Sequence, residues 1–107
     1  MYSEPVRRRH PRVPAGFLVK LHAAGRVLVQ KARNLSMTGV LLEGAAAAPG
    51  ETVVMEIPLP NEQRTIAVTG EVRRGGTPDD DVTAIRFLDL DWDDMFALAR
   101  FVGPRLP

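Results

Sequence analysis

Arginine, amide and hydroxyl side chains gather in two short segments of this 107-residue chain, residues 8–12 (RRHPR) and residues 34–39 (NLSMTG). Arginine presents a planar fork that pairs with phosphate or with the O6/N7 edge of guanine, and its plane can stack on a base. Asn34 offers a donor and an acceptor to a base edge, and Ser36 offers a hydroxyl to a phosphate oxygen. Together, the two segments predict a site for an anionic, guanine-like ligand.

Each segment alone also has an ordinary structural interpretation. Gly39 allows a positive φ and the close approach of a ligand, but Asn-x-Ser-x-x-Gly is also the sequence of an ordinary polar turn, and an arginine-rich terminus is often simply solvated. Residues 1–34 carry a net charge of +7 and residues 35–107 a net charge of −6, which points to an anionic partner for the first third. Folding can also interleave these charges, so both interpretations stay open at this level.

Prolines lie among the arginines of the N-terminal segment. Because proline disfavours the helical conformation in the residue before it, His10 and Val13 are predicted to be extended, and Arg8 and Arg12 do not share a helix face. We therefore predict a flexible basic arm over residues 1–15, followed by one folded domain over residues 16–107.

Six short segments of the domain alternate apolar and polar side chains, which is the pattern of half-buried strands. They span residues 16–22, 26–33, 40–42, 53–59, 65–73 and 82–87. Gly70 is expected to mark a bulge or bend, and residues 75–81 are expected to form a solvated loop. Short strands at this spacing predict an all-β fold, a six-stranded antiparallel β-barrel.

Helical spacing replaces this alternation over residues 91–102. The apolar stripe consists of Trp92, Met95, Phe96, Ala99 and Val102. Asp91 suits the N-cap, and the Gly-Pro pair at residues 103–104 ends the helix. Because an exposed stripe would be a large apolar patch, we expect it to pack across the barrel.

The sequence lacks the residues that several classes of function need. The chain has no cysteine, which excludes disulfides and a nucleophilic thiol and is compatible with a cytoplasmic location. No apolar segment approaches the roughly 18 residues that span a bilayer. The two histidines show no metal-ligand spacing, and no nucleophile lies beside a candidate base. We therefore predict no metal site, no catalytic residue and no enzymatic activity.

The two polar segments together resemble the signature of the PilZ family, bacterial receptors for cyclic di-GMP. That signature is Arg-x-x-x-Arg followed about twenty residues later by Asp/Asn-x-Ser-x-x-Gly. Arg8 and Arg12 match its first element, and Asn34, Ser36 and Gly39 match its second. Both binding elements are intact, so the resemblance implies a member that binds its ligand.

The resemblance extends over nearly the whole chain. Arg7 suits the doubled arginine that is common in the family, residues 84–88 look like its last strand, and the closing helix sits where PilZ domains have one. Ala84 departs from the pattern, because a glycine is frequent there, and this affects strand packing more than ligand contact. The resemblance implies a six-stranded barrel with a C-terminal helix and an N-terminal arm that wraps over cyclic di-GMP, often as an intercalated pair of molecules.

The family's binding roles can be carried over by position. Arg8 and Arg12 would contact phosphate and guanine, Asn34 and Ser36 would hold the ligand from the barrel surface, and Gly39 would keep the turn open. Arg7 is an additional expected contact. Cyclic di-GMP is the only small molecule implied, and no cofactor is expected.

The resemblance thus implies a receptor that passes a second-messenger signal to an unidentified effector protein, in control of motility, biofilm or polysaccharide. Two alternatives remain. A small nucleic-acid-binding barrel would use the basic first third, although the chain has only six aromatic residues for base stacking. An interaction domain that binds no nucleotide would order the arm against acidic partners. A nucleic-acid partner is not expected.

Overall fold

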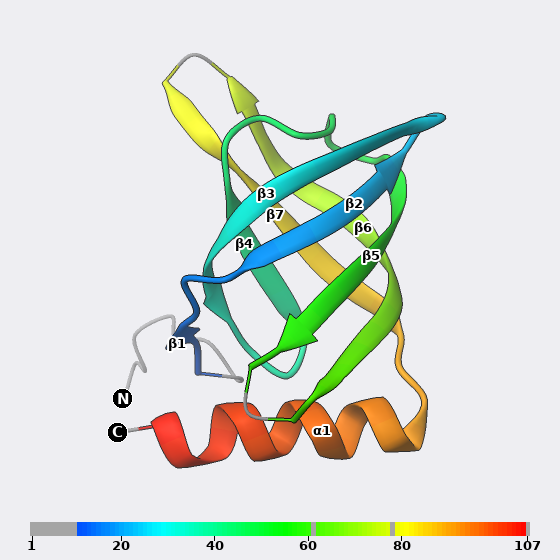
Figure 1. Ribbon diagram of the computed structural model, residues 1–107. Helices are drawn as coiled ribbons and strands as arrows, with labels where there is room; N and C mark the ends of the chain where they lie inside the picture. The colour runs from blue at the N-terminus through cyan, green and yellow to red at the C-terminus, as the bar shows by residue number, and fades with distance from the viewer. Residues whose placement is uncertain (1–10, 61, 78, 107) are drawn as a thin grey trace, which may run out of the picture.

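Six strands close into one antiparallel barrel in the computed structural model, which describes residues 11–60, 62–77 and 79–106. The elements are β1 (Val13–Pro14), β2 (Leu18–Ala23), β3 (Arg26–Leu35), β4 (Gly39–Glu43), β5 (Thr52–Leu59), β6 (Arg64–Thr77), β7 (Asp80–Asp89), α1 (Trp92–Val102) and η1 (Gly103–Arg105). Around the barrel the order is β3-β2-β5-β6-β7-β4, and β4 pairs with β3 to close it (Figure 1). The predicted six-stranded antiparallel β-barrel with a C-terminal helix is confirmed.

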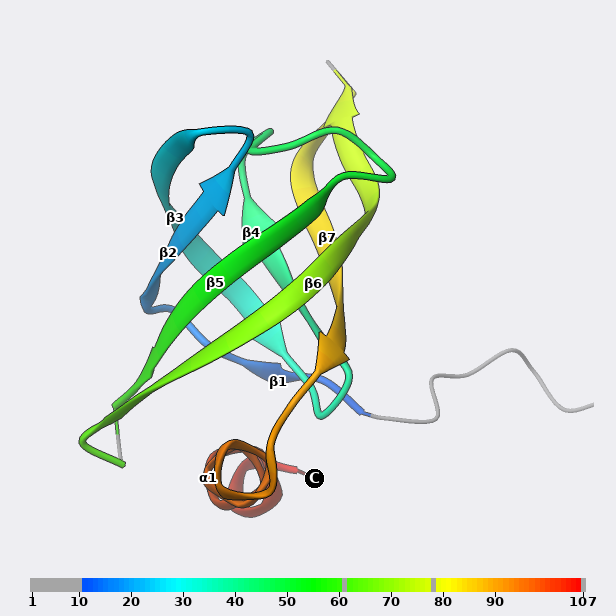
Figure 2. The ribbon, with the colours of Figure 1, turned by 90° about the vertical axis from the view of Figure 1, so that its right-hand side faces the viewer.

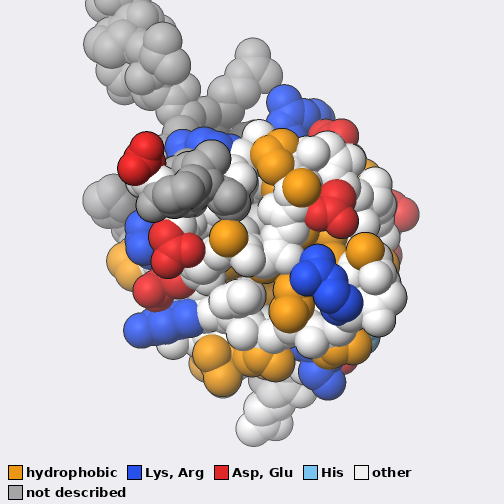
Figure 3. Space-filling model, turned by 90° about the horizontal axis from the view of Figure 1, so that it is seen from above, with side chains coloured by type: hydrophobic (Ala, Val, Ile, Leu, Met, Phe, Trp, Pro, Cys, Tyr) orange, Lys and Arg blue, Asp and Glu red, His pale blue; other side chains and the backbone are white. Residues whose placement is uncertain are grey.

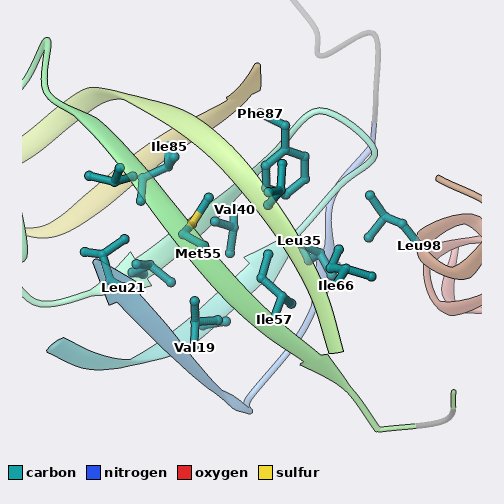
Figure 4. Packing of buried hydrophobic residues seen from close by; sticks show 14 of the residues in the cluster. Val19, Leu21, Leu35, Val40, Met55, Ile57, Ile66, Ile85, Phe87 and Leu98 are labelled. Atoms are coloured by element: carbon teal, nitrogen blue, oxygen red, sulfur yellow. The ribbon is translucent and has the colours of Figure 1, made fainter. Parts of the chain in front are cut away.

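Alternation of side chains builds the barrel, as the sequence predicts. In β2, Val19 and Leu21 are fully buried, whereas Leu18 and Lys20 lie on the outside. The inward residues of all six strands form one core (Figure 4). Its members include Leu35, Val40, Met55, Ile57, Ile66, Ile85 and Phe87.

The hairpin of β6 and β7 is longer than the sequence predicts. The composition of residues 75–81 predicts a solvated loop, but β6 continues to Thr77 and β7 begins at Asp80. Gly75 allows the strands to stay paired, because its φ is +130° and a Cβ there would lie 2.0 Å from the carbonyl oxygen of Val82. A register shift next to Gly70 confirms the irregularity expected at that residue.

A short strand, β1, attaches the residues before the barrel to the sheet. Val13 pairs with Leu35 and Pro14 with Asn34, and Val13 is buried. Residues 1–10 of the arm predicted over residues 1–15 lie outside the described residues, so the flexibility of that arm stays a prediction. The last part of the range is anchored on β3, directly before the barrel.

Helix α1 lies across one end of the barrel, as Figures 1 and 2 show from two sides. The face that it buries is not the predicted stripe. The buried residues are Asp94, Ala97, Leu98, Phe101 and Val102. Trp92 and Phe96 are instead 71% and 54% exposed. Leu98 points from α1 toward the barrel core in Figure 4, and of the predicted stripe only Val102 is fully buried.

An ion pair contributes to this orientation of the helix. Asp94 is 6% exposed, and Arg64 donates to its Oδ1 from Nη2 at 2.6 Å and from Nε at 3.1 Å. The Oδ1 of Asp91 accepts a hydrogen bond of 2.7 Å from the backbone nitrogen of Asp94, which confirms the N-cap. A carboxylate in the sequence predicts an exposed, polar face of the helix. Burial of Asp94 is favourable here because Arg64 on β6 pairs with it.

Glu62 and Arg100 form a second link between α1 and the segment before β6. The guanidinium donates to Oε1 of Glu62 from Nη2 at 2.6 Å and from Nε at 2.8 Å. These hydrogen bonds hold the pKa of Glu62 below its usual value of 4.5. Because the folded-state pKa is lowered, the pair stabilises the fold above the ordinary pKa, and this stabilisation is lost as the pH falls through the lowered pKa.

We therefore expect Glu62→Gln to lower the free energy of unfolding at about pH 7 and to have a smaller effect at about pH 3. Urea denaturation at the two pH values measures the difference. In an Arg100→Gln background the same substitution should have little effect at either pH. An undiminished effect of Glu62→Gln at the lower pH would contradict this assignment.

Candidate functional site

The pairing of β1 with β3 brings the two polar segments into contact. Arg12 directly precedes Val13, whose partner on β3 is Leu35. Nη1 of Arg12 donates a hydrogen bond of 3.0 Å to Oδ1 of Asn34. An arginine of the first segment and the asparagine of the second, separated by 22 positions in the chain, thus lie side by side.

Ser36 holds the turn between β3 and β4. Its Oγ accepts hydrogen bonds from the backbone nitrogens of Thr38, at 3.1 Å, and Gly39, at 3.2 Å. Its own backbone nitrogen donates to the carbonyl oxygen of Gly39 at 2.9 Å. Ser36 is only 2% exposed, so in this structure its hydroxyl shapes the turn, and direct contact with a phosphate stays a prediction.

Gly39 is required for a reason that differs from the predicted one. It is not among the residues with positive φ. A Cβ at this position would instead lie 2.4 Å from the carbonyl oxygen of Ile85 on the neighbouring strand β7. Gly39 pairs with Arg86, so the missing side chain lets β4 and β7 approach closely at the edge of the site.

A cavity of about 210 Å³ adjoins this turn. It is lined by Arg12, Thr38, Gly39, Arg73, Ala84, Ile85 and Arg86. The three guanidinium groups come from the residue before β1, from β6 and from β7. A concentration of arginine forks beside the hydroxyl-bearing Thr38 suits an anion, above all one with phosphate groups.

The three arginines differ in what holds them. Arg12 is tied to Asn34, and Nη1 of Arg73 donates to Oε1 of Glu71 at 3.1 Å on an exposed part of β6. Arg86 forms no side-chain hydrogen bond or ion pair within the described part of the chain. A ligand can therefore bind this guanidinium without breaking a side-chain contact to any described residue.

The predicted site does not include three polar residues of the lining, Thr38, Arg73 and Arg86. Arg73 ends a predicted strand, Thr38 lies in the predicted polar segment without a role of its own, and Arg86 lies in the predicted last strand. The strand register places Arg86 opposite Gly39, so only a correct pairing of β4 with β7 would have revealed it. Arg7 and Arg8 lie outside the described residues, and their contribution stays a prediction.

Other parts of the described chain offer less to an anionic ligand. A cavity of about 290 Å³ outside β2 and β5 is lined by Leu18, Lys20, Val29, Glu56, Pro58 and Thr65, with one basic and one acidic residue. No three His, Asp or Glu side chains among the described residues are placed to hold a metal ion. No helix in the described ranges is both long enough and apolar enough to cross a bilayer.

The class of protein follows from this fold and from a sequence comparison. The sequence matches the PilZ domain over residues 6–103, which is most of its length. The chain therefore belongs to the PilZ domain family. PilZ domains are non-catalytic receptors, so this is a family of binding proteins and not of enzymes.

Solved structures agree with this assignment at the level of the fold. The inhibitor of motility MotI/DgrA of Bacillus subtilis superposes with a TM-score of 0.73 at 20% identity, over 94% of this chain and 51% of that protein. The PilZ domain of Escherichia coli YcgR, solved with c-di-GMP, gives a TM-score of 0.69 at 17% identity, over 94% of this chain and 92% of that chain.

A PilZ domain of CeSA from a cellulose-synthesizing bacterium gives a TM-score of 0.69 at 17% identity, over 88% of this chain and 96% of that chain. The present chain thus spans whole PilZ domains but about half the length of the Bacillus protein. Comparison with curated protein sequences gives no match.

Proposed function

We propose that this protein is a cytoplasmic receptor for cyclic di-GMP. The observation that carries the proposal is the cavity beside the Ser36 turn, where Arg12, Arg73 and Arg86 come together. Cyclic di-GMP offers two phosphates and two guanines, and a guanidinium fork fits either group. Likeness in fold to a PilZ domain solved with c-di-GMP supports the same ligand.

In this proposal the two polar segments have different roles in binding. Arg8 and Arg12 contact phosphate and guanine from the arm, with Arg7 as an additional contact. The Asn34 side chain, already oriented by Arg12, offers its remaining donors to a base edge. Ser36 and Gly39 maintain the conformation of the turn beside the cavity.

A calorimetric titration of the full chain with cyclic di-GMP tests the proposal directly. We expect a saturable heat of binding. Prior addition of a cyclic di-GMP analogue should reduce this heat, whereas GMP or random RNA should not. The absence of heat at high micromolar ligand would overturn it. A salt-dependent interaction with RNA that cyclic di-GMP does not displace would instead favour a nucleic-acid-binding barrel.

We further propose that the ligand orders the arm and so changes the surface that an effector protein recognises. Ordering a segment costs free energy that the new ionic contacts must exceed. Limited proteolysis within residues 5–12 should therefore slow when cyclic di-GMP is added. An unchanged cleavage rate at saturating ligand would count against this mechanism while leaving binding itself intact.

Arg86 gives a sharp prediction because it lines the cavity and its side chain has no hydrogen-bond or ion-pair partner among the described residues. Arg86→Ala should weaken cyclic di-GMP binding about 10-fold, the size of one lost charge-assisted hydrogen bond. Its free energy of unfolding should stay within about 0.5 kcal/mol of the parent. Calorimetry and urea denaturation measure the two quantities. Full affinity in Arg86→Ala would remove this residue from the site.

A further inference from the structure

Helix α1 carries a second face that the barrel does not cover. Trp92 and Phe96 are 71% and 54% exposed, and their ring centroids lie 6.0 Å apart. Ala99 and Gly103 continue the same face at helical spacing, and both are exposed. Gly103 keeps helical angles of −53° and −54°, and a Cβ added to it would meet nothing within 4 Å. The exposed face, defined as these four residues, thus runs the whole length of the helix.

Side-chain size divides the exposed face into two halves. Its N-terminal half has the two large rings of Trp92 and Phe96, and its C-terminal half has the two smallest residues, Ala99 and Gly103. In an antiparallel pair of identical helices, one two-fold axis between Phe96 and Ala99 sets Phe96 against Ala99 and Trp92 against Gly103 of the other copy. Each large ring then meets a small residue, which permits the close approach that helix packing requires.

Charged residues are also distributed unequally between the two ends of the helix. The exposed acids Asp89, Asp91 and Asp93 lie at its N-terminal end, and the exposed bases Arg105 and Arg100, the latter hydrogen-bonded to Glu62, lie at its C-terminal end. An antiparallel pair brings each acidic end next to a basic end, and it also aligns the two helix dipoles favourably. A parallel pair would instead bring like charges together and set ring against ring.

We propose that the exposed face of α1 is an interface for a second copy of this protein, in an antiparallel helix pair with two-fold symmetry. A pair of three-turn helices buries less area than a typical permanent dimer, so the association should be weak, with a dissociation constant of about 10–300 µM. None of the four residues of the exposed face lines the arginine cavity, so self-association is expected with or without cyclic di-GMP.

Sedimentation equilibrium between about 5 and 500 µM protein tests the interface over the range in which a weak dimer forms. We expect a monomer at the low end and a dimer at the high end. Trp92 is the only tryptophan in the chain, so its emission should shift to shorter wavelength over the same range. Phe96→Glu should shift the dissociation constant upward at least about 10-fold. Val27→Glu is the matched control, because Val27 is 59% exposed on the barrel and should not affect association.

Ala99→Phe separates the specific pair from general stickiness of an apolar surface. It adds apolar area, so it would strengthen non-specific association, but it fills the space that Phe96 of the other copy needs and should weaken the antiparallel pair at least about 10-fold. Circular dichroism checks that both helix variants remain folded. A monomer at every concentration, or association that Ala99→Phe leaves unchanged or strengthens, would overturn the proposal.

Discussion

Replacement of Arg12 by alanine is expected to weaken cyclic di-GMP binding about 10- to 100-fold. Arg12 lines the cavity and donates a hydrogen bond to Asn34, so its loss removes a guanidinium contact and frees the neighbouring amide to rotate. Arg12→Lys keeps the charge but not the fork, and its affinity should fall between those of the parent and the alanine variant. Calorimetric titration of the three proteins at one salt concentration measures the series.

Arg26→Ala is the matched control for this series. Arg26 begins β3 at the end of the barrel opposite α1, so its removal changes net charge by the same amount without touching the cavity (Figure 1). Its affinity should stay within about 2-fold of the parent, since screening leaves little interaction over such a distance. Equal losses in Arg12→Ala and Arg26→Ala would mean that net charge, and not this cavity, governs binding.

The barrel could be predicted because each strand has one buried and one exposed side. The alternation of Val53, Met55, Ile57 and Leu59 predicts a strand over residues 53–59, and β5 spans Thr52–Leu59. The same rule applies to β2, in which inward and outward residues alternate without interruption. Periodicity of two is a local property, so it survives in the sequence without knowledge of the neighbouring strand.

The residues of the cavity were harder to predict because they depend on register. Residue types and their order are enough to single out the two short segments, and in the structure Arg12 donates a hydrogen bond to Asn34. Arg73 and Arg86 reach the same cavity only through the pairing of β6 with β7 and of β7 with β4. Such pairings join residues far apart in the chain, and no short sequence pattern specifies them.

Net charge along the sequence was also a weak guide to the surface. The first third carries +7, yet acidic and basic side chains are interspersed among the described residues at the end of the barrel seen in Figure 3. Antiparallel pairing places strands from the basic and the acidic parts of the chain side by side, as in the pairing of Lys20 with Glu56. The arrangement of a few arginines around one cavity is therefore more informative than the charge of a segment.

The orientation of α1 depends on one buried aromatic residue more than on the two exposed ones. Phe101 is 2% exposed and meets the ring of Phe17 edge-on at a centroid distance of 5.6 Å. The guanidinium of Arg105 lies 3.8 Å above its ring. Phe17 directly precedes β2 and follows the segment that carries Arg12, so this cluster attaches both the helix and the base of the arm to the barrel.

Phe101→Ala should therefore lower the free energy of unfolding by about 3–5 kcal/mol, because it leaves a cavity and removes both ring contacts. Phe96→Ala removes the same side chain five positions earlier on the same helix, where it is 54% exposed, and should cost less than about 1 kcal/mol. Urea denaturation at a few micromolar, below the range proposed for self-association, compares the two. Comparable losses in both variants would mean that α1 is held by its exposed face, contrary to the packing described. A large loss in Phe101→Ala alone would show that burial, and not the number of aromatic residues, fixes which side of the helix meets the barrel.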